Sequence, residues 1–231
     1  VVVVVWYMRK KREFLRQRFF QQINRVRMEN LRSRISPHFT FNVLGREINQ
    51  FNGSEEVKHN LMELVKYLRR SLELTEKLSV SLQDELDFVR TYIELERGRV
   101  GEDFVATITV EDGLDATRIM IPSMIVQIPV ENAIKHGLAG KDGKKELMVY
   151  VSRETNGIRI TVTDNGRGYL PQVVSATRGT GTGLKVLYQT IQLLNTKNKS
   201  DKIRFNITNR SDGQTGTEVS VYIPFRFSYD L

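Results

Sequence analysis

The sequence contains no cysteine, only three histidines and no apolar run long enough to cross a membrane. Without thiols, disulfide bonds and thiolate metal sites are excluded, and a reducing compartment is expected. His38, His59 and His136 are too few and too scattered to form a convincing metal cluster. The rest of the composition, 40% hydrophobic and 27% charged over 231 residues, predicts an ordinary folded protein with one large domain or two small ones.

The positive charge of the chain is confined to its first part. Of the 35 Lys/Arg and 27 Asp/Glu, residues 1–46 hold eleven and two, which leaves 24 and 25 for the remaining 185 residues. The net charge of +8 is therefore a local property and does not describe the whole surface. No aromatic or Arg-rich reading element follows the basic stretch, so a nucleic-acid partner is not expected.

The chain opens with VVVVVWYM followed by RKKR. Trp and Tyr at the interface and Lys/Arg on the cytoplasmic side are typical of the end of a membrane helix, but eight apolar residues fall short of the roughly 20 that span a bilayer. Because position 1 is not Met, we interpret residues 1–12 as the end of a transmembrane helix with a basic juxtamembrane segment. This places the rest on the cytoplasmic side of the inner (plasma) membrane. An expression scar and the start of a β-strand are the alternatives.

Two helical patterns follow. Apolar side chains recur at helical spacing through residues 9–50, the pattern breaks at NGSEE (52–56), and a second run extends from 57 to 97. Within it, Ser81 and Asp84 fit a capping box. The apolar stripe of this part consists of Leu82, Leu86, Val89 and Ile93. We therefore expect a helical hairpin over 13–97, which buries its stripes by pairing into a dimeric four-helix bundle.

The periodicity changes after RGRVGED. Five segments alternate like half-buried strands, and two segments near 122–139 and 183–196 have helical spacing. The expected strands are 104–110, 146–154, 157–164, 202–208 and 217–225. Residues 98–231 are thus expected to form an α+β domain, a sheet with helices over one face.

Pro37 stands directly before His38 within the first helical pattern. An interior proline costs a helix about 3 kcal/mol, because it lacks an N–H and crowds the preceding turn. Pro37 could loosen or bend the helix at His38, or it could be the first residue of a helix that Ser36 caps. The apolar spacing on either side favours a continuous helix.

Three stretches of the second domain carry polar groups in a pattern that packing alone does not require. In PVENAIKHG (129–137), Glu131 and Lys135 are four residues apart, and so are Asn132 and His136. In DNGRG (164–168), an Asp at a strand end can accept a hydrogen bond from an exocyclic amine, and the glycines allow close backbone approach. In GTGTGLKVL (179–187), a Gly-rich turn opens a helix and favours phosphate. Each is weak alone, since DNG is also an ordinary hairpin turn.

Together these three stretches resemble the nucleotide-binding domain of the GHKL superfamily, which includes gyrase and the histidine kinases. The resemblance implies a GHKL-type α/β sandwich with a mixed sheet, and ATP and Mg²⁺ as cofactors. It implies that Asn132 holds Mg²⁺ and that Asp164 contacts adenine. The implied lid over the phosphates covers about residues 169–180, between Gly166 and Gly168 on one side and Gly181 and Gly183 on the other. Lys135, His136 and Leu184, within the same motifs, are grouped with the nucleotide site.

The first domain narrows the resemblance. LRSRISPHFTFNVLGREI and YLRRSLE…VSLQDELDFVRTYIELERGR look like the two hairpin helices of LytS-type sensor histidine kinases. Ser36 and Thr40 replace the usual Asn and Leu beside the phosphoacceptor His, and Pro129 stands one residue later than usual. The resemblance implies ATP-dependent autophosphorylation of His38 and transfer to an aspartate of a response regulator.

The remaining roles follow from the same resemblance. Asn42, one turn after His38, is the candidate for orienting the imidazole ring, and Glu131 for a base or for orienting metal-bound water. The cation that contacts the phosphates is open between Lys135, Lys185 and Arg178. Two other functions remain: a degenerate GHKL ATP-binding protein that acts as phosphatase or signalling scaffold for its partner, and a GHKL ATPase or anti-sigma-type serine kinase.

Overall fold

The computed structural model describes residues 6–7, 9–11, 55–168, 182–198 and 200–229. His38, Asn42, Gly181 and the lid expected at 169–180 lie outside the described residues. Among the helices that the structure describes, none is both long and apolar enough to span a bilayer.

The second helical run is interrupted. Helix α3 (Glu55–Glu76) is followed by the short strand β1 (Ser79–Ser81) and then by helix α4 (Leu82–Val100). The expectation of one unbroken helix from 57 to 97 was therefore wrong. The expected cap is confirmed: Ser81 Oγ accepts a hydrogen bond from the Asp84 N–H at 3.0 Å and so begins a new helix. The backbone of Ser81 is still extended, with ψ at 147°, as is usual for an N-cap residue, so helical geometry starts only at Leu82.

Helix α4 packs with the sheet domain, although its sequence continues the hairpin pattern. Its expected stripe, Leu82, Leu86, Val89 and Ile93, is buried in the same hydrophobic cluster as the sheet. Strand β1 pairs antiparallel with β3 (Met120–Pro122), and the Leu82 N–H donates to the Ile119 carbonyl at 2.8 Å. Helix α4 is thus tied by backbone hydrogen bonds to residues nearly forty positions later.

The five main strands form one mixed sheet in the order β2-β4-β5-β7-β6. Strand β2 (Phe104–Val110) runs parallel to β4 (Lys145–Glu154), and every other neighbouring pair is antiparallel. Strands β4 and β5 (Gly157–Asp164) form a hairpin, and β7 (Thr217–Pro224) lies between β5 and β6 (Arg204–Asn209). All five strands expected from the alternating pattern are confirmed, with ends that agree to within two residues.

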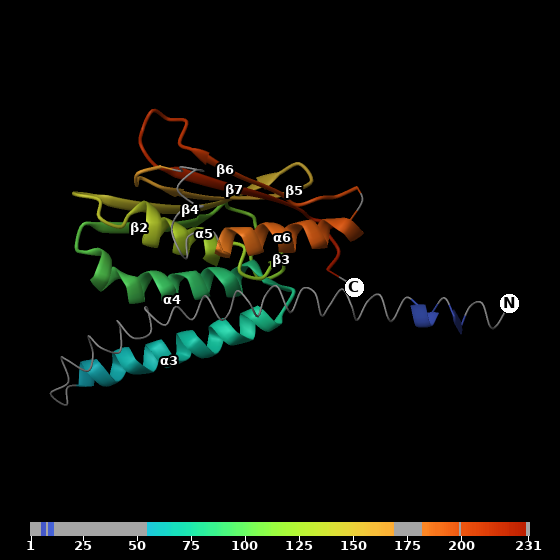
Figure 1. Ribbon diagram of the computed structural model, residues 1–231, viewed down its shortest axis with the longest axis horizontal. Helices are drawn as coiled ribbons and strands as arrows, with labels where there is room; N and C mark the ends of the chain where they lie inside the picture. Colours follow the sequence, from blue (N-terminus) through green and yellow to red (C-terminus); the bar gives the residue numbers. More distant parts are fainter. Residues whose placement is uncertain (1–5, 8, 12–54, 169–181, 199, 230–231) are drawn as a thin grey trace.

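The helices cover one face of this sheet, as expected. Figure 1 shows α5 (Gln127–Asn132) and α6 (Thr182–Lys197) directly beneath the sheet, with α4 below them and α3 outermost. The inward side chains of the strands, such as Val149, Ile160 and Val221, are buried against these helices. The opposite face carries Val105, Met148 and Tyr150, which are exposed. The alternation of the strands therefore reflects one covered and one open face.

Candidate nucleotide site

Asp164 is the last residue of β5, the central strand of the sheet, and its carboxyl lies beside Gly137, a few residues after the end of α5. Only 3% of its surface is exposed. Its Oδ1 accepts hydrogen bonds from the backbone N–H groups of Gly166, at 2.8 Å, and Thr217, at 3.4 Å. Burial raises the pKa of the Asp164 carboxyl, although these two N–H groups, the Thr217 hydroxyl and Arg210 work in the opposite direction. The sequence predicted a hydrogen-bond acceptor at this strand end, and the structure adds that the carboxyl is buried.

Two glycines allow the backbone to come against this carboxyl. A Cβ atom on Gly137 would lie 2.8 Å from Asp164 Oδ1, and one on Gly166 would lie 2.1 Å from the Gly137 carbonyl oxygen. Real Cβ atoms essentially never approach other heavy atoms so closely, so both positions require glycine. The Arg167 N–H also donates to the Gly137 carbonyl at 3.3 Å. The PVENAIKHG and DNGRG stretches, separate in sequence, are therefore in direct contact.

The β6–β7 connection completes the surroundings of Asp164, and the sequence reasoning missed it. A Cβ on Gly216 would lie 1.9 Å from the Asp164 carbonyl oxygen, and Thr217 is a hydrogen-bond donor to the carboxyl. The only signal in the sequence is the short GTE stretch before an alternating strand. Its proximity to Asp164 depends on β7 pairing with β5, where Glu218 faces Thr163.

The helix that carries Asn132 is short and widens at its end. Helix α5 has six residues and continues as a π-helical turn, Ala133–Gly137, in which the Leu138 N–H reaches the Ala133 carbonyl at 2.8 Å. Such π turns are found frequently at functional sites. The unusual position of Pro129 is thus accommodated in a helix that still presents Glu131 and Asn132 at its last turn.

Asn132 is half-buried, and its Nδ2 donates to the Ile128 carbonyl oxygen at 2.8 Å. This bond uses the amide nitrogen, whereas a metal ion binds the amide oxygen. Neighbouring Glu131 forms an ion pair with Lys135, in which both side chains are largely buried. Amide and carboxylate oxygens are the donors that Mg²⁺ prefers, and Mg²⁺ usually takes one or two protein oxygens together with water and phosphate. The residues present therefore fit the implied metal.

Glu131 also lies close enough to helix α4 to act electrostatically on Tyr92. Together with Glu96 it raises the pKa of the Tyr92 hydroxyl well above its usual value, although burial is the larger cause. Glu96 is buried and pairs with Arg99. The Tyr92 hydroxyl of α4 therefore lies near two carboxylates, those of Glu96 and Glu131.

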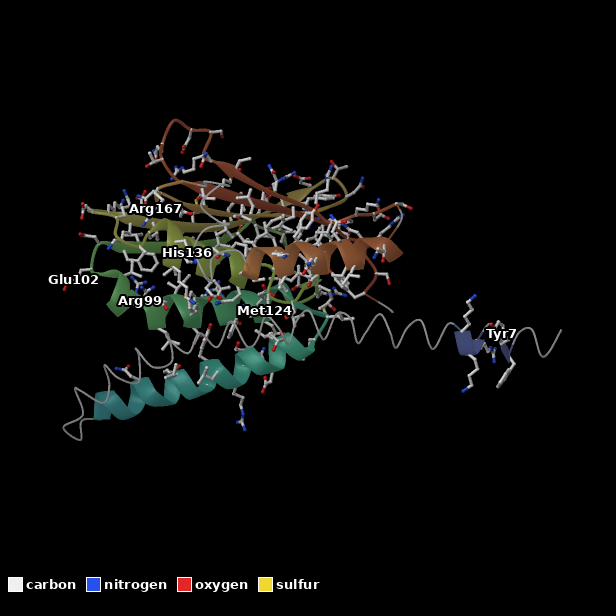
Figure 2. All side chains as sticks on the ribbon, viewed as in Figure 1. Tyr7, Arg99, Glu102, Met124, His136 and Arg167 are labelled. Carbon is white, nitrogen blue, oxygen red and sulfur yellow. The ribbon has the colours of Figure 1, made fainter. Side chains whose placement is uncertain are left out.

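His136 and Arg167 lie together at one end of the domain, whereas Met124, before α5, lies nearer its middle (Figure 2). Burial lowers the pKa of the His136 imidazole, and the Lys135 and Arg167 cations lower it further. Glu131 acts in the opposite direction. A neutral imidazole beside two cations is therefore expected at pH 7.

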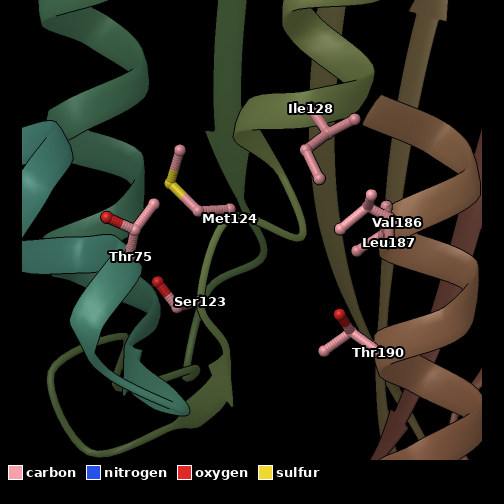
Figure 3. A pocket seen from close by; sticks show the side chains of 7 residues that line it. All are labelled: Thr75, Ser123, Met124, Ile128, Val186, Leu187 and Thr190. Carbon is pink, nitrogen blue, oxygen red and sulfur yellow. The ribbon is translucent and has the colours of Figure 1, made fainter. Parts of the chain in front are cut away.

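The third stretch opens α6. Gly183 and Leu184 lie in its first turn, where Leu184 packs against the core, and Lys185 is exposed. Helices α5 and α6 are in contact. A small cavity of about 20 Å³ lies between them and the end of α3, lined by Ile128, Val186 and Thr190 among others (Figure 3). The cavity thus lies where α5, α6 and the end of α3 meet.

Gly168 has a φ of +84°, which residues with a Cβ rarely adopt, and a Cβ there would lie 2.8 Å from the Asn209 Oδ1. In the described part of the chain, no group of three or more His, Asp or Glu side chains could hold a metal ion by itself. A metal at Asn132 would therefore depend on ligands from phosphate and water as well.

This topology, with a buried Asp at a strand end against a short helix bearing Glu and Asn, defines a nucleotide-binding domain of the GHKL class. Residues 117–226 match the family model of the histidine kinase-, DNA gyrase B- and HSP90-like ATPases. Residues 26–104 match the histidine kinase model. Together with the relatives described next, these two matches support a LytS-type histidine kinase, as the resemblance predicted.

Two curated relatives illustrate this resemblance. The chain is 32% identical over 81% of its length to the sensor histidine kinase/phosphatase LytS of Staphylococcus aureus strain MRSA252. It is 28% identical over 88% of its length to the sensor histidine kinase YpdA of Escherichia coli K12. It covers only 33% and 35% of these two proteins, so it spans about a third of their length.

Among solved structures, the histidine kinase domain of the blue-light-activated kinase EL346 from Erythrobacter litoralis matches with a TM-score of 0.49 and 15% identity. The match covers 89% of this chain and 94% of that one. The class of fold follows from the strand order and the ATPase family model described above.

Proposed function

We propose that this chain is the kinase part of a two-component sensor histidine kinase, which uses ATP to phosphorylate its own His38 and passes the phosphoryl group to an aspartate of a response regulator. The observation that carries the proposal is the enclosed Asp164 carboxyl, placed by Gly137 and Gly166 against the helix that bears Glu131 and Asn132. A buried hydrogen-bond acceptor beside the side-chain oxygens of Glu131 and Asn132 suits an adenine base and a metal-bound phosphate.

The residues of the site have separate roles in this proposal. Asp164 accepts a hydrogen bond from the adenine amine, and Asn132 binds Mg²⁺ through its amide oxygen. When bound, Mg²⁺ neutralises charge on the phosphate oxygens. Glu131 orients water or accepts a proton, and its ion pair with Lys135 keeps it beside Asn132. His136, Gly166, Gly168, Gly181, Gly183 and Leu184 line the nucleotide.

The reaction at His38 needs a neutral imidazole, which is available near pH 7. One ring nitrogen bonds to the γ-phosphorus while the bond to the ADP oxygen breaks, so ADP leaves and a phosphoramidate forms. Asn42, one helical turn away, orients the ring. Charge neutralisation and positioning supply most of the acceleration in such transfers.

The assembly is part of the same proposal. Residues 13–97 pair with a second copy as a four-helix bundle, residues 98–231 bind the nucleotide, and residues 1–12 continue a membrane segment, so that the kinase part is cytoplasmic at the plasma membrane. Because the stripe of α4 is buried against the sheet, the support for pairing comes from the apolar positions of the first helical pattern, which an isolated helix would leave exposed. Figure 1 shows α3 as the outermost helix.

Labelling of the full chain with ATP carrying a radioactive γ-phosphate tests the proposal. His38→Gln is expected to abolish incorporation and to leave ATP affinity within about twofold, because the acceptor and the nucleotide belong to different parts of the chain. His59→Gln is the matched control and should label normally. Full labelling of His38→Gln, or a label on the wild type that survives acid, would contradict the assignment.

A phosphatase activity toward the response regulator is the second candidate. It is favoured by the name of the Staphylococcus aureus relative, a histidine kinase/phosphatase. The two activities are separated by giving the chain a phosphorylated regulator without ATP. Release of phosphate from that regulator by a chain that never labels itself would establish the degenerate alternative.

A further inference from the structure

The start of helix α5 is capped by a residue from another helix. Glu85, in α4, is 0% exposed. Its Oε2 accepts a hydrogen bond from the Met124 N–H at 2.7 Å, and its Oε1 accepts from the N–H groups of Val126 at 2.6 Å and Gln127 at 3.2 Å. Three backbone donors that precede or begin α5 therefore share one carboxyl from about forty residues earlier.

This help is needed because the local sequence supplies no cap. The residue in the N-cap position is Val126, whose side chain has no polar atom. Pro129, two residues into the helix, lacks an N–H. The first N–H groups of a helix have no partner within it, and they usually find one in a Ser, Thr, Asp or Asn at the N-cap. Glu85 takes that part here.

The turn before α5 also has an unfavourable backbone conformation. Met124 has a φ of +70°, the one described residue other than glycine with a positive value. Side chains with a Cβ rarely adopt this region, and they do so where the surroundings hold them in it. The Met124 N–H is one of the three that Glu85 binds, and its side chain is buried beside Thr75 and Ser123 (Figure 3).

Helix α3 touches the same turn. Ser123 Oγ donates to the Leu74 carbonyl oxygen, and the Ser123 N–H donates to the Leu78 carbonyl oxygen at 3.1 Å. The Gln127 amide also donates to the Tyr67 hydroxyl at 3.4 Å. These contacts bind Ser123 and the Gln127 side chain to α3 and the residues after it, whereas Glu85 binds the backbone N–H groups of the turn.

We propose that Glu85 is a positioning residue for the nucleotide site, which sets the direction of α5 and thereby the place of Asn132 and Glu131. Asn132 is five residues after Gln127, which is about 7.5 Å along a helix. A six-residue helix has few hydrogen bonds of its own, so a change at its start moves its end. The inference rests on the proposed metal role of Asn132.

Calorimetric titration of the full chain with ATP, with Mg²⁺ and with chelator, tests this inference on Glu85→Gln. The Gln side chain keeps the volume but turns an N–H₂ group toward an N–H donor. We expect MgATP affinity to fall by about tenfold, the usual scale for residues that support a metal ligand. Affinity for ATP without metal, which depends on Asp164, should change less than twofold.

Two further variants make the result specific. Glu94→Gln, the same change on the exposed side of α4, should bind like wild type. Asn132→Ala should lose the metal-dependent part of binding. If Asn132→Ala binds MgATP normally, the proposed metal role is wrong, and so is the purpose assigned to Glu85. If Asn132→Ala loses the metal-dependent part of ATP binding while a folded Glu85→Gln keeps it, only the inference on Glu85 is overturned.

Amide hydrogen exchange on the wild-type chain tests the proposal without any substitution, so the result does not depend on whether a variant folds. The N–H groups of Met124, Val126 and Gln127 are expected to exchange as slowly as those of the central strand β5. Exchange as fast as that of the exposed turn at Asp112 and Gly113 would show that Glu85 does not hold them, and would refute the proposal.

Discussion

Glu85 and Asp164 are both buried carboxyls beside the same short helix, yet their surroundings differ. Glu85 lies at the start of α5 and accepts three backbone N–H groups, the closest at 2.6 Å. Asp164 lies at the far end and accepts two backbone N–H groups, at 2.8 Å and 3.4 Å, both through Oδ1, and its third partner is the Thr217 hydroxyl. Burial raises the pKa of Asp164, because its partners do not fully offset the lost water. The carboxyl that caps α5 thus binds more backbone N–H groups, and at shorter distances, than the carboxyl for which we propose a ligand role.

The largest expected effect is the difference in the free energy of unfolding between alanine variants of the two carboxyls. Glu85→Ala should lower the free energy of unfolding by about 3 kcal/mol or more, because three buried N–H groups lose their acceptor and each such loss costs about 1–3 kcal/mol. Asp164→Ala should cost clearly less. Urea denaturation of both variants measures the difference. Equal losses in the free energy of unfolding would contradict the different roles given to the two carboxyls.

Gly137→Ala tests the contact that brings the helix end to Asp164. Its Cβ would lie 2.8 Å from Asp164 Oδ1, which is held by two hydrogen bonds and cannot easily move away. Overpacking of this kind costs about 1–3 kcal/mol, and ATP affinity should fall with it. Gly98→Ala, at an exposed position of α4, is the control and should gain about 0.5–1 kcal/mol. Thermal unfolding and calorimetry give the two readouts.

Asp164→Asn should weaken ATP binding while it stabilises the free protein. Loss of a charged acceptor for the adenine amine costs about 1.5–3 kcal/mol, which is a loss of about tenfold or more in affinity. Because the pKa of Asp164 is raised, the folded state binds its proton more tightly than the unfolded state does. The wild type therefore loses stability as pH rises from about 3.8 through the raised pKa.

The Asn variant has no such titration, so its advantage in melting temperature should be larger at pH 7 than at pH 3.5. Asp112→Asn, in an exposed turn, serves as control and should show a far smaller dependence on pH. A wild type that melts at a higher temperature than Asp164→Asn at pH 7 would contradict the interpretation that burial of the Asp164 carboxylate destabilises the free protein.

The smallest effect concerns the contact between α3 and α4. Arg70 and Asp84 form an ion pair at 2.6 Å, but their side chains are 38% and 48% exposed. Arg70→Ala should therefore change the free energy of unfolding by less than about 1 kcal/mol. The stacked rings of Tyr67 and Phe88, with centroids 4.9 Å apart, should matter more. Urea denaturation of Arg70→Ala and Tyr67→Ala measures both losses in the free energy of unfolding. A larger loss for Arg70→Ala would contradict this order.

Much of the domain could be predicted because its signals are local. Alternating side chains located all five strands, since one face of the sheet is covered and the other is open. The Ser81 cap was visible because the residues that form it are three apart in the chain. Asp164 and Gly166 could be proposed for the same reason, because they are two residues apart. The DNG stretch alone is also an ordinary hairpin turn, and it became informative because two further motifs accompany it.

Other features were decided only by the tertiary structure. The break between α3 and α4 was missed because helical spacing continues across it, and pairing of β1 with β3 overrides that spacing. Gly216 and Thr217 reach Asp164 only because β7 lies beside β5. Glu85 looked like one more polar position on a helix. Its capping of α5 depends on two segments about forty residues apart, and the spacing of side chains within one helix carries no information about which backbone N–H groups another segment will leave without a partner.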